Sequence, residues 1–240
     1  MNAIHSIIKV WQRRPTRLVE RWRLFRRLIR EHLAIALSVM FCLFFLWLRD
    51  FLFVPRQFWF LGANLILALV PLVVAVVFDH RYRHRAPGMG ALIMLFLWLL
   101  FLPNAPYLIT DLIHLRPRLM IPLWYDALLM FLFAFTGVMA GALSIGKIFK
   151  RLRYWIGRPV ALSICMISVP LSGVGVYMGR FLRWNSWDFL FRPQHVLMTT
   201  FIELSNPLQN METVGLAMVS AVVFASVCLF ILPTNPSHYE

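Results

Sequence analysis

Six long apolar runs take up most of this chain and limit the folds it can adopt. They are Leu33 to Leu48, Phe58 to Phe78, Ala86 to Leu102, Ile121 to Gly146, Pro159 to Gly179 and Thr213 to Leu232. A helix needs about 20 mainly apolar residues to cross a bilayer, and about 17 suffice. Only 14% of the residues are charged and the mean hydropathy is +0.72, whereas soluble chains are about a quarter charged. The sequence predicts an all-α membrane protein, a six-helix transmembrane bundle.

A basic segment precedes the first apolar run. Residues 1–31 contain nine Lys and Arg, and apolar residues recur among them at helical spacing: Leu18, Trp22, Phe25 and Ile29. This pattern predicts an amphipathic helix on the cytoplasmic membrane surface. A mitochondrial transit peptide or a nucleic-acid-binding segment would also be basic, but the interleaved Trp and Phe favour lipid as the partner over nucleic acid. The expected division is therefore 1–31 interfacial helix, 32–233 six-span domain and 234–240 cytoplasmic tail.

The distribution of positive charge predicts an orientation. The N-terminal segment and the second and fourth loops carry 17 Lys and Arg, whereas the other three loops carry 7. Short cytoplasmic segments are enriched in Lys and Arg. Both termini are thus expected in the cytoplasm.

The stretch from Leu102 to Leu115 interrupts this pattern at the predicted outer face. Pro103 and Pro106 should end the third apolar helix at about Leu102, because proline lacks the N–H that continues a helix. A short broken helix is expected to follow, with Asn104 as its N-cap. Tyr107, Asp111 and His114 would then share one face of it.

Two further segments bring polar groups to the same face. The first contains Asp126 near the start of the fourth span, where a carboxylate needs a partner because its burial in the membrane is costly. The second runs from Gly179 to Asp188, and a continuing helix would place Arg180, Trp184 and Asp188 on one side. Either Arg180 or Arg183 could pair with Asp126 or Asp111.

These groups suggest a site that combines acid–base chemistry with anion binding. His114, oriented by Asp111, would accept or donate a proton, because an imidazole titrates near neutral pH. Asp126 is a third candidate for chemistry, or a metal ligand with the other two, although no metal-binding motif supports a metal site. The candidate substrate-binding residues are Asn104, Tyr107, Arg180, Arg183, Trp184, Asn185 and Asp188. The expected ligand is an anionic or lipid-linked small molecule, and no cofactor can be named.

Three other interpretations stay open. The tryptophans could form an aromatic belt and the arginines could extend to the interface or pair spans together. The chain could also be a transporter, or a structural or accessory subunit of a membrane complex.

The glycine pairs Gly137 and Gly141, and Gly175 and Gly179, are expected to be helix-packing faces.

The blocks FLPNAPYLITDLIHL, WYD and GRFLRWNSWD resemble an uncharacterised bacterial membrane family catalogued as domain of unknown function 1361. The likeness extends over roughly residues 35 to 235 and leaves out the basic N-terminal segment. It implies a multi-pass protein of the bacterial cytoplasmic (inner) membrane with no established activity, and it supplies no catalytic residues.

Overall fold

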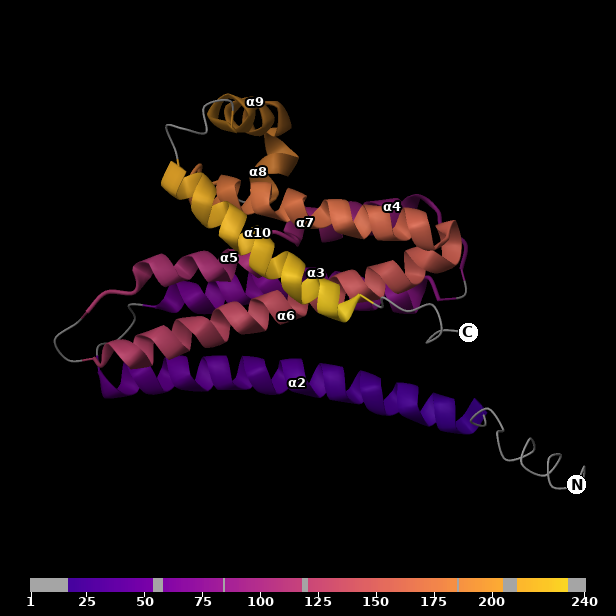
Figure 1. Ribbon diagram of the computed structural model, residues 1–240, viewed down its shortest axis with the longest axis horizontal. Coiled ribbons are helices and arrows are strands. Elements are labelled where there is room, and N and C mark those ends of the chain that lie inside the picture. Colours follow the sequence, from indigo (N-terminus) through magenta and orange to yellow (C-terminus); the bar gives the residue numbers. More distant parts are fainter. Residues whose placement is uncertain are drawn as a thin grey trace, which may run out of the picture. The chain divides into compact units, whose positions relative to one another are not determined.

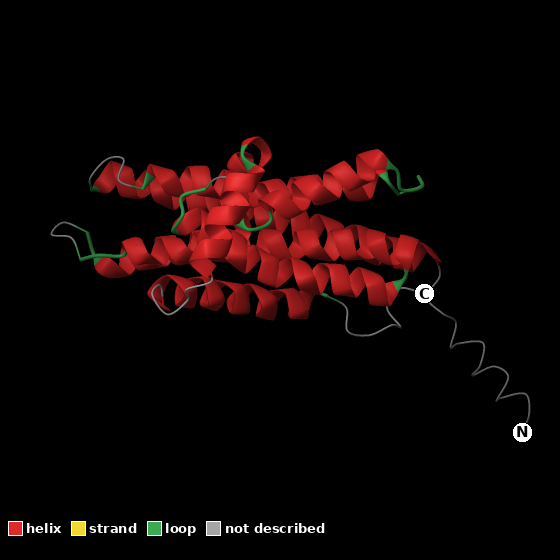
Figure 2. Cartoon of the chain, turned by 90° about the horizontal axis from the view of Figure 1, so that it is seen from above, coloured by secondary structure: helices red, strands yellow, loops and turns green. Residues whose placement is uncertain are grey.

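The computed structural model is built from helices joined by short connections, and it describes residues 17–53, 58–83, 85–117, 121–184, 186–204 and 211–232. No strand is present within these ranges (Figure 2). The helices are α2 Arg17–Leu52, α3 Trp59–Arg81, α4 Met89–Phe101, α5 Asn104–Tyr107, the 3₁₀-helix η1 Leu108–His114, α6 Leu123–Ile156, α7 Arg158–Arg180, α8 Ser186–Phe191, α9 Pro193–Leu204 and α10 Met211–Ile231. Six segments are long and apolar enough to cross a membrane, which confirms the predicted all-α membrane bundle.

The chain divides into two compact units, Met1–Met40 and Phe41–Glu240. In the first unit, the described residues form the first part of α2. This helix continues without a break from Arg17 to Leu52, so no break in the helix marks the expected boundary at residue 31. Residues 1–16 and the expected tail 234–240 lie outside the described residues. All further features belong to the second unit.

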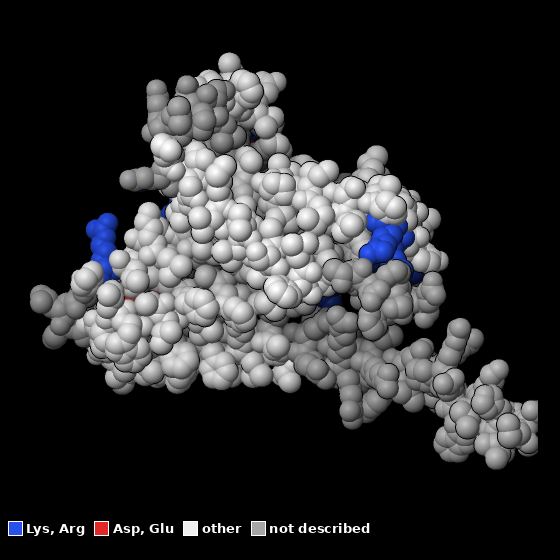
Figure 3. Space-filling view, in the orientation of Figure 1, with Lys and Arg blue, Asp and Glu red and all other residues white. Residues whose placement is uncertain are grey.

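Helix α6 is the centre of the second unit. It packs against α3, α7 and α10 and also against the short segments α5 and η1. Its most apolar stretch is 67% buried, more than any other span. Large apolar side chains from its neighbours complete the core, including Phe78, Trp98 and Phe224. On the face in Figure 3, Lys and Arg lie near the two ends and the described surface between them is almost uncharged, as expected of a surface in contact with lipid.

The third span is interrupted. Helix α4 has 13 residues, which at 1.5 Å per residue is about 20 Å, too short for a hydrocarbon core of about 30 Å. The crossing is completed by α5 and η1, so that the whole candidate span is Met89–His114. The predicted end of the apolar helix near Leu102 is confirmed. The polar stretch, however, lies within the span rather than after it.

The structure corrects the predicted helix after this break. Only the four residues of α5 are α-helical, and the following seven form a 3₁₀ turn. Asn104 is not an N-cap. Its side-chain amide instead donates to the carbonyl oxygen of Phe101 at 2.9 Å and to the hydroxyl of Ser186 at 3.2 Å. The side chain of Asn104 therefore links the last residue of α4 to the first residue of α8.

Glycines on α6 and α7 make room for this irregular segment, in agreement with the predicted packing faces. A Cβ at Gly137 would lie 2.5 Å from Leu108 Cδ1 and 2.8 Å from the carbonyl oxygen of Ala105. A Cβ at Gly175 would collide with the ring of Pro103. The backbone of α5 therefore approaches α6 and α7 more closely than any larger residue would allow.

Replacing Gly137 with alanine tests this close approach. We expect Gly137→Ala to lower the free energy of unfolding by about 1–3 kcal/mol, because a methyl group would meet a backbone oxygen that cannot move aside. Gly215→Ala is the matched control, because nothing lies within 4 Å of its Cβ position on the spanning helix α10. Thermal unfolding in detergent compares the two, and equal losses of stability would contradict the close-packing explanation.

Candidate functional site

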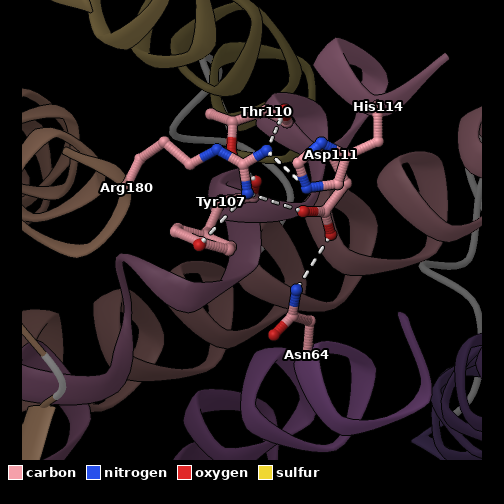
Figure 4. A network of polar contacts seen from close by, with 6 residues as sticks. All are labelled: Asn64, Tyr107, Thr110, Asp111, His114 and Arg180. Atoms are coloured by element: carbon pink, nitrogen blue, oxygen red, sulfur yellow. Dashed lines mark hydrogen bonds and ion pairs between the residues drawn. The ribbon is translucent and has the colours of Figure 1, made fainter. Parts of the chain in front are cut away.

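A polar network centres on Arg180, the last residue of α7. Its Nη1 donates to Asp111 Oδ1 at 3.1 Å and to the hydroxyl of Tyr107 at 3.3 Å. Its Nη2 donates to the carbonyl oxygen of Thr110 at 3.1 Å and lies 3.2 Å from His114 Nε2. Figure 4 shows these groups converging from α5 and η1 on one guanidinium. The structure thus brings together four residues that the sequence suggested: Tyr107, Asp111, His114 and Arg180.

Asp111 is held from two sides. Its side chain is fully buried, and its second oxygen accepts a hydrogen bond from the amide of Asn64 in α3 at 3.0 Å. The Arg180 side chain is itself only 10% exposed. A buried carboxylate needs such partners, because an unpaired buried charge is costly. The Asp111–Arg180 pair therefore joins η1 to α7, while Asn64 joins η1 to α3.

The contact with Arg180 bears on the tautomer of His114. A guanidinium can only donate hydrogen bonds, so a hydrogen bond from Arg180 Nη2 to His114 Nε2 requires a neutral imidazole with its proton on Nδ1. The exposed imidazole ring also stands edge-on to Phe60, with the ring centres 5.2 Å apart. Arg180 is therefore the group that links His114 to Asp111.

A cavity of about 620 Å³ adjoins the network. Residues of α3, α4, α5, α7, α8 and α9 line it, and most of their side chains are aliphatic or aromatic. Asn64 and Tyr107 belong both to the cavity wall and to the network. The remaining polar residues of the wall are Asn104, Trp184, Ser186 and Thr200. The site thus combines an apolar space with a polar wall.

Asp126 is part of a different ion pair. Its carboxylate accepts from Arg49 Nε at 2.8 Å, and both side chains are at most 2% exposed. The guanidinium of Arg49 also lies 4.1 Å from the ring centre of Phe58. Of the pairings that the sequence left open, the structure shows Arg180 with Asp111. The alternative that Arg180 or Arg183 pairs with Asp126 is corrected, because Asp126 pairs with Arg49. Arg49 could not be recognised from the sequence as the partner of Asp126, because it follows an apolar run and resembles the first residue of a loop.

The segment after α7 differs from the predicted continuous helix. Helix α7 ends at Arg180, and Arg183 adopts a φ of 57° before α8 begins at Ser186. Arg180, Trp184 and Asp188 thus do not share one helix. Arg183 is exposed, and Trp184 lines the cavity with its indole nitrogen buried and without a hydrogen-bond partner among the described residues. Asp188 lies in the first turn of α8, and Asn185 is outside the described residues.

Two members of the network were not among the predicted site residues. The first is Asn64, whose amide contacts η1 through the carboxylate of Asp111. Its presence in an otherwise apolar span was a usable signal. The carbonyl of Thr110 gave no such signal, because a backbone group carries no residue-specific information. Among the residues that the structure describes, no group of three or more His, Cys, Asp or Glu could hold a metal ion.

Most of this chain matches a known protein family. A family model described as "Protein of unknown function (DUF1361)" matches residues 63–229. The chain belongs to this family. The match includes every residue of the Arg180 network and begins after Arg49. No curated protein and no solved structure matches the chain.

The Arg49–Asp126 pair yields a stability prediction for this DUF1361 member. Asp126→Leu should cost about 3–5 kcal/mol, because it leaves the buried guanidinium of Arg49 with only the more distant carboxylate of Asp50, 3.5 Å from Nη1. The double variant Arg49→Met, Asp126→Leu should recover most of that loss, because it removes both charges. Unfolding curves in detergent compare the three proteins. A double variant less stable than Asp126→Leu would show that the pair contributes through something other than charge compensation.

Proposed function

We propose that this membrane protein binds an amphipathic, lipid-linked ligand beside the Arg180 network. One observation carries this proposal: Asn64 and Tyr107 belong to both the network and the cavity wall. A ligand in the cavity would therefore place its polar group against side chains whose positions are already fixed by hydrogen bonds. Such preorganised polar groups in a mainly apolar pocket are typical of small-molecule sites.

Arg180 and Arg183 are proposed to have different roles. The donors Nη1 and Nη2 of Arg180 both have protein partners, so this residue positions Asp111 and Tyr107. Arg183 is exposed at the turn that follows α7, where its charge could meet the anionic group of a ligand. An arginine fork suits phosphate and carboxylate groups. This division supports a ligand with its anionic group near the membrane surface.

His114 is the proposed acid–base group. Its Nε2 lone pair accepts a hydrogen bond from Arg180, so it cannot take a proton while that contact lasts. An anionic group beside Arg180 would compete for the guanidinium and free the imidazole. His114 would then become a base only when a charged ligand is present, which couples binding to proton transfer.

The interrupted third span favours a transporter as a second candidate, because broken helices form binding sites in many transporters. Polar side chains deeper in the bundle argue against a continuous polar path. Ser168, Ser172 and Thr136 donate to carbonyls of their own helices, and Ser144 donates to Gly141 while accepting from Trp98. These hydroxyls are satisfied locally, so a binding protein remains the better-supported proposal.

The buried ion pairs strengthen the proposed orientation. Arg49, Arg151 and Arg180 pair with aspartates inside the bundle and should not be counted as loop charges. Without them, the 17 against 7 positive charges of the two predicted faces become 16 against 5. We therefore place the network toward the outer side, with both termini in the cytoplasm.

Arg180→Lys tests the proposed site without removing the charge that Asp111 requires. We expect co-purified lipid to fall about tenfold, because a single ammonium cannot hold Asp111, Tyr107 and Thr110 together. Arg116→Lys is the control, since Arg116 is exposed outside the cavity wall. Native mass spectrometry of protein in mild detergent measures bound lipid. Equal lipid content in both variants would contradict the proposal, whereas His114→Gln should keep the lipid because its amide oxygen can still accept from Arg180.

Arg183→Gly separates the charge of Arg183 from its backbone conformation. Glycine adopts a positive φ freely, so the variant should match wild type or gain about 1 kcal/mol of stability. Retention of anionic lipid should nevertheless fall severalfold, because the exposed cation is lost. Arg183→Ala should lose the same lipid without gaining stability. Unchanged anionic lipid in both variants would exclude Arg183 from the binding site.

A further inference from the structure

The edge of the cavity consists of apolar side chains that are exposed at the surface of the bundle. Phe96 of α4, Leu171 of α7, and Leu197 and Phe201 of α9 all line the cavity, yet their side chains are 45%, 46%, 55% and 74% exposed. Figure 1 shows α8 and α9 outside the row of spanning helices, next to α7. Because these rim residues are apolar, and α4 and α7 belong to candidate membrane spans, an opening at this rim suits contact with lipid better than contact with water.

Two polar atoms of the wall lack a hydrogen-bond acceptor among the described residues: the indole nitrogen of Trp184, which is buried, and the hydroxyl of Tyr107. Thr200 donates to the carbonyl of Val196 in its own helix, and Ser186 donates to the carbonyl of Leu100 while accepting from Asn104. The hydroxyl of Tyr107 accepts from Arg180, and its own proton has no acceptor among the residues described. A charged donor behind a hydroxyl strengthens it as a donor in turn. The wall thus offers one polarised O–H to an occupant.

A molecule that enters the cavity from the bilayer has few sources of binding free energy. A hydrocarbon chain that moves from the bilayer into an apolar cavity gains little hydrophobic free energy, because lipid tails are as apolar as the cavity wall. Filling a void restores dispersion contacts, and a hydrogen bond to Tyr107 adds a directional contact. The volume of about 620 Å³ lies within the range of ordinary ligand pockets.

We infer that the cavity holds one long hydrocarbon chain, alkyl or prenyl, which enters from the bilayer past α9. Its terminal oxygen accepts a hydrogen bond from the hydroxyl of Tyr107. This inference rests on the proposed function, because that oxygen is the junction to the polar group beside the network. It names the substrate class as single-chain amphipaths joined through an oxygen atom.

Two neighbouring residues of α3 provide a matched test. Leu67 lines the cavity, whereas Ile66 is 68% exposed and is not part of its wall. The full-length protein in phosphatidylcholine nanodiscs is irradiated with a long-chain fatty acid that carries a diazirine in its tail, and mass spectrometry locates the adducts. In wild type the adducts should concentrate on cavity residues such as Met178. Leu67→Trp should lower these adducts about tenfold by filling the space, and Ile66→Trp should leave them within about twofold.

A second pair of variants, in α4, controls for the possibility that Leu67→Trp unfolds the protein. Leu99→Trp fills the cavity from α4, and Leu92→Trp places the same side chain on an exposed position of that helix. Adducts spread evenly over exposed residues, or unchanged in both folded cavity variants, would overturn the inference. If Arg180→Lys still reduced co-purified lipid in that case, the proposed function would stand without it. If cavity adducts persisted at wild-type yield in Tyr107→Phe, the hydrogen bond from Tyr107 would be excluded.

Discussion

The break in the third span leaves backbone groups that must find hydrogen-bond partners within a bundle of apolar helices. A continuous helix satisfies its own backbone, whereas a break leaves carbonyls that must be bonded by the protein. Arg180 donates to the carbonyl of Thr110, and Asn104 donates to the carbonyl of Phe101. Glycines on α6 and α7 bring the break deep enough to be shielded from lipid. The polar network is thus the means by which an irregular segment exists inside this bundle.

Three arginine–aspartate pairs fix the spans relative to one another. Arg49 of α2 pairs with Asp126 of α6, Arg180 of α7 with Asp111 of η1, and Arg151 of α6 with Asp79 of α3. Lipid offers helices little hydrophobic reason to associate, so van der Waals packing and specific polar contacts decide the arrangement. Each buried charge would be costly alone, which excludes arrangements that separate a pair. The pairs therefore specify which helices are neighbours more than they add stability.

The sequence predicted the spans well, because a run of apolar residues determines a transmembrane helix locally. It also grouped Tyr107, Asp111 and His114, and all three contact Arg180, although the α-helical face on which that grouping was based is not formed. The pairing of Asp126 with Arg49 was not predictable, because it depends on which of several arginines the packing brings near. The 3₁₀ form of η1 was missed for a related reason: Arg180 and Asn64 hold it from other helices. In both cases the sequence failed to predict the structure because partners distant in the sequence, rather than local propensity, determine it.

The network also explains how a buried site could respond to a charged ligand. Asp111 has two partners, Asn64 and Arg180, so it keeps one hydrogen bond if the guanidinium shifts. His114 is a weaker hydrogen-bond acceptor for Arg180 than Asp111 is, because a neutral acceptor competes poorly with an anion for a cationic donor. An arriving anion would therefore displace His114 from Arg180 before it displaced Asp111. Linkage then requires the reverse effect: protonation of His114, which ends its contact with Arg180, must favour the bound anion.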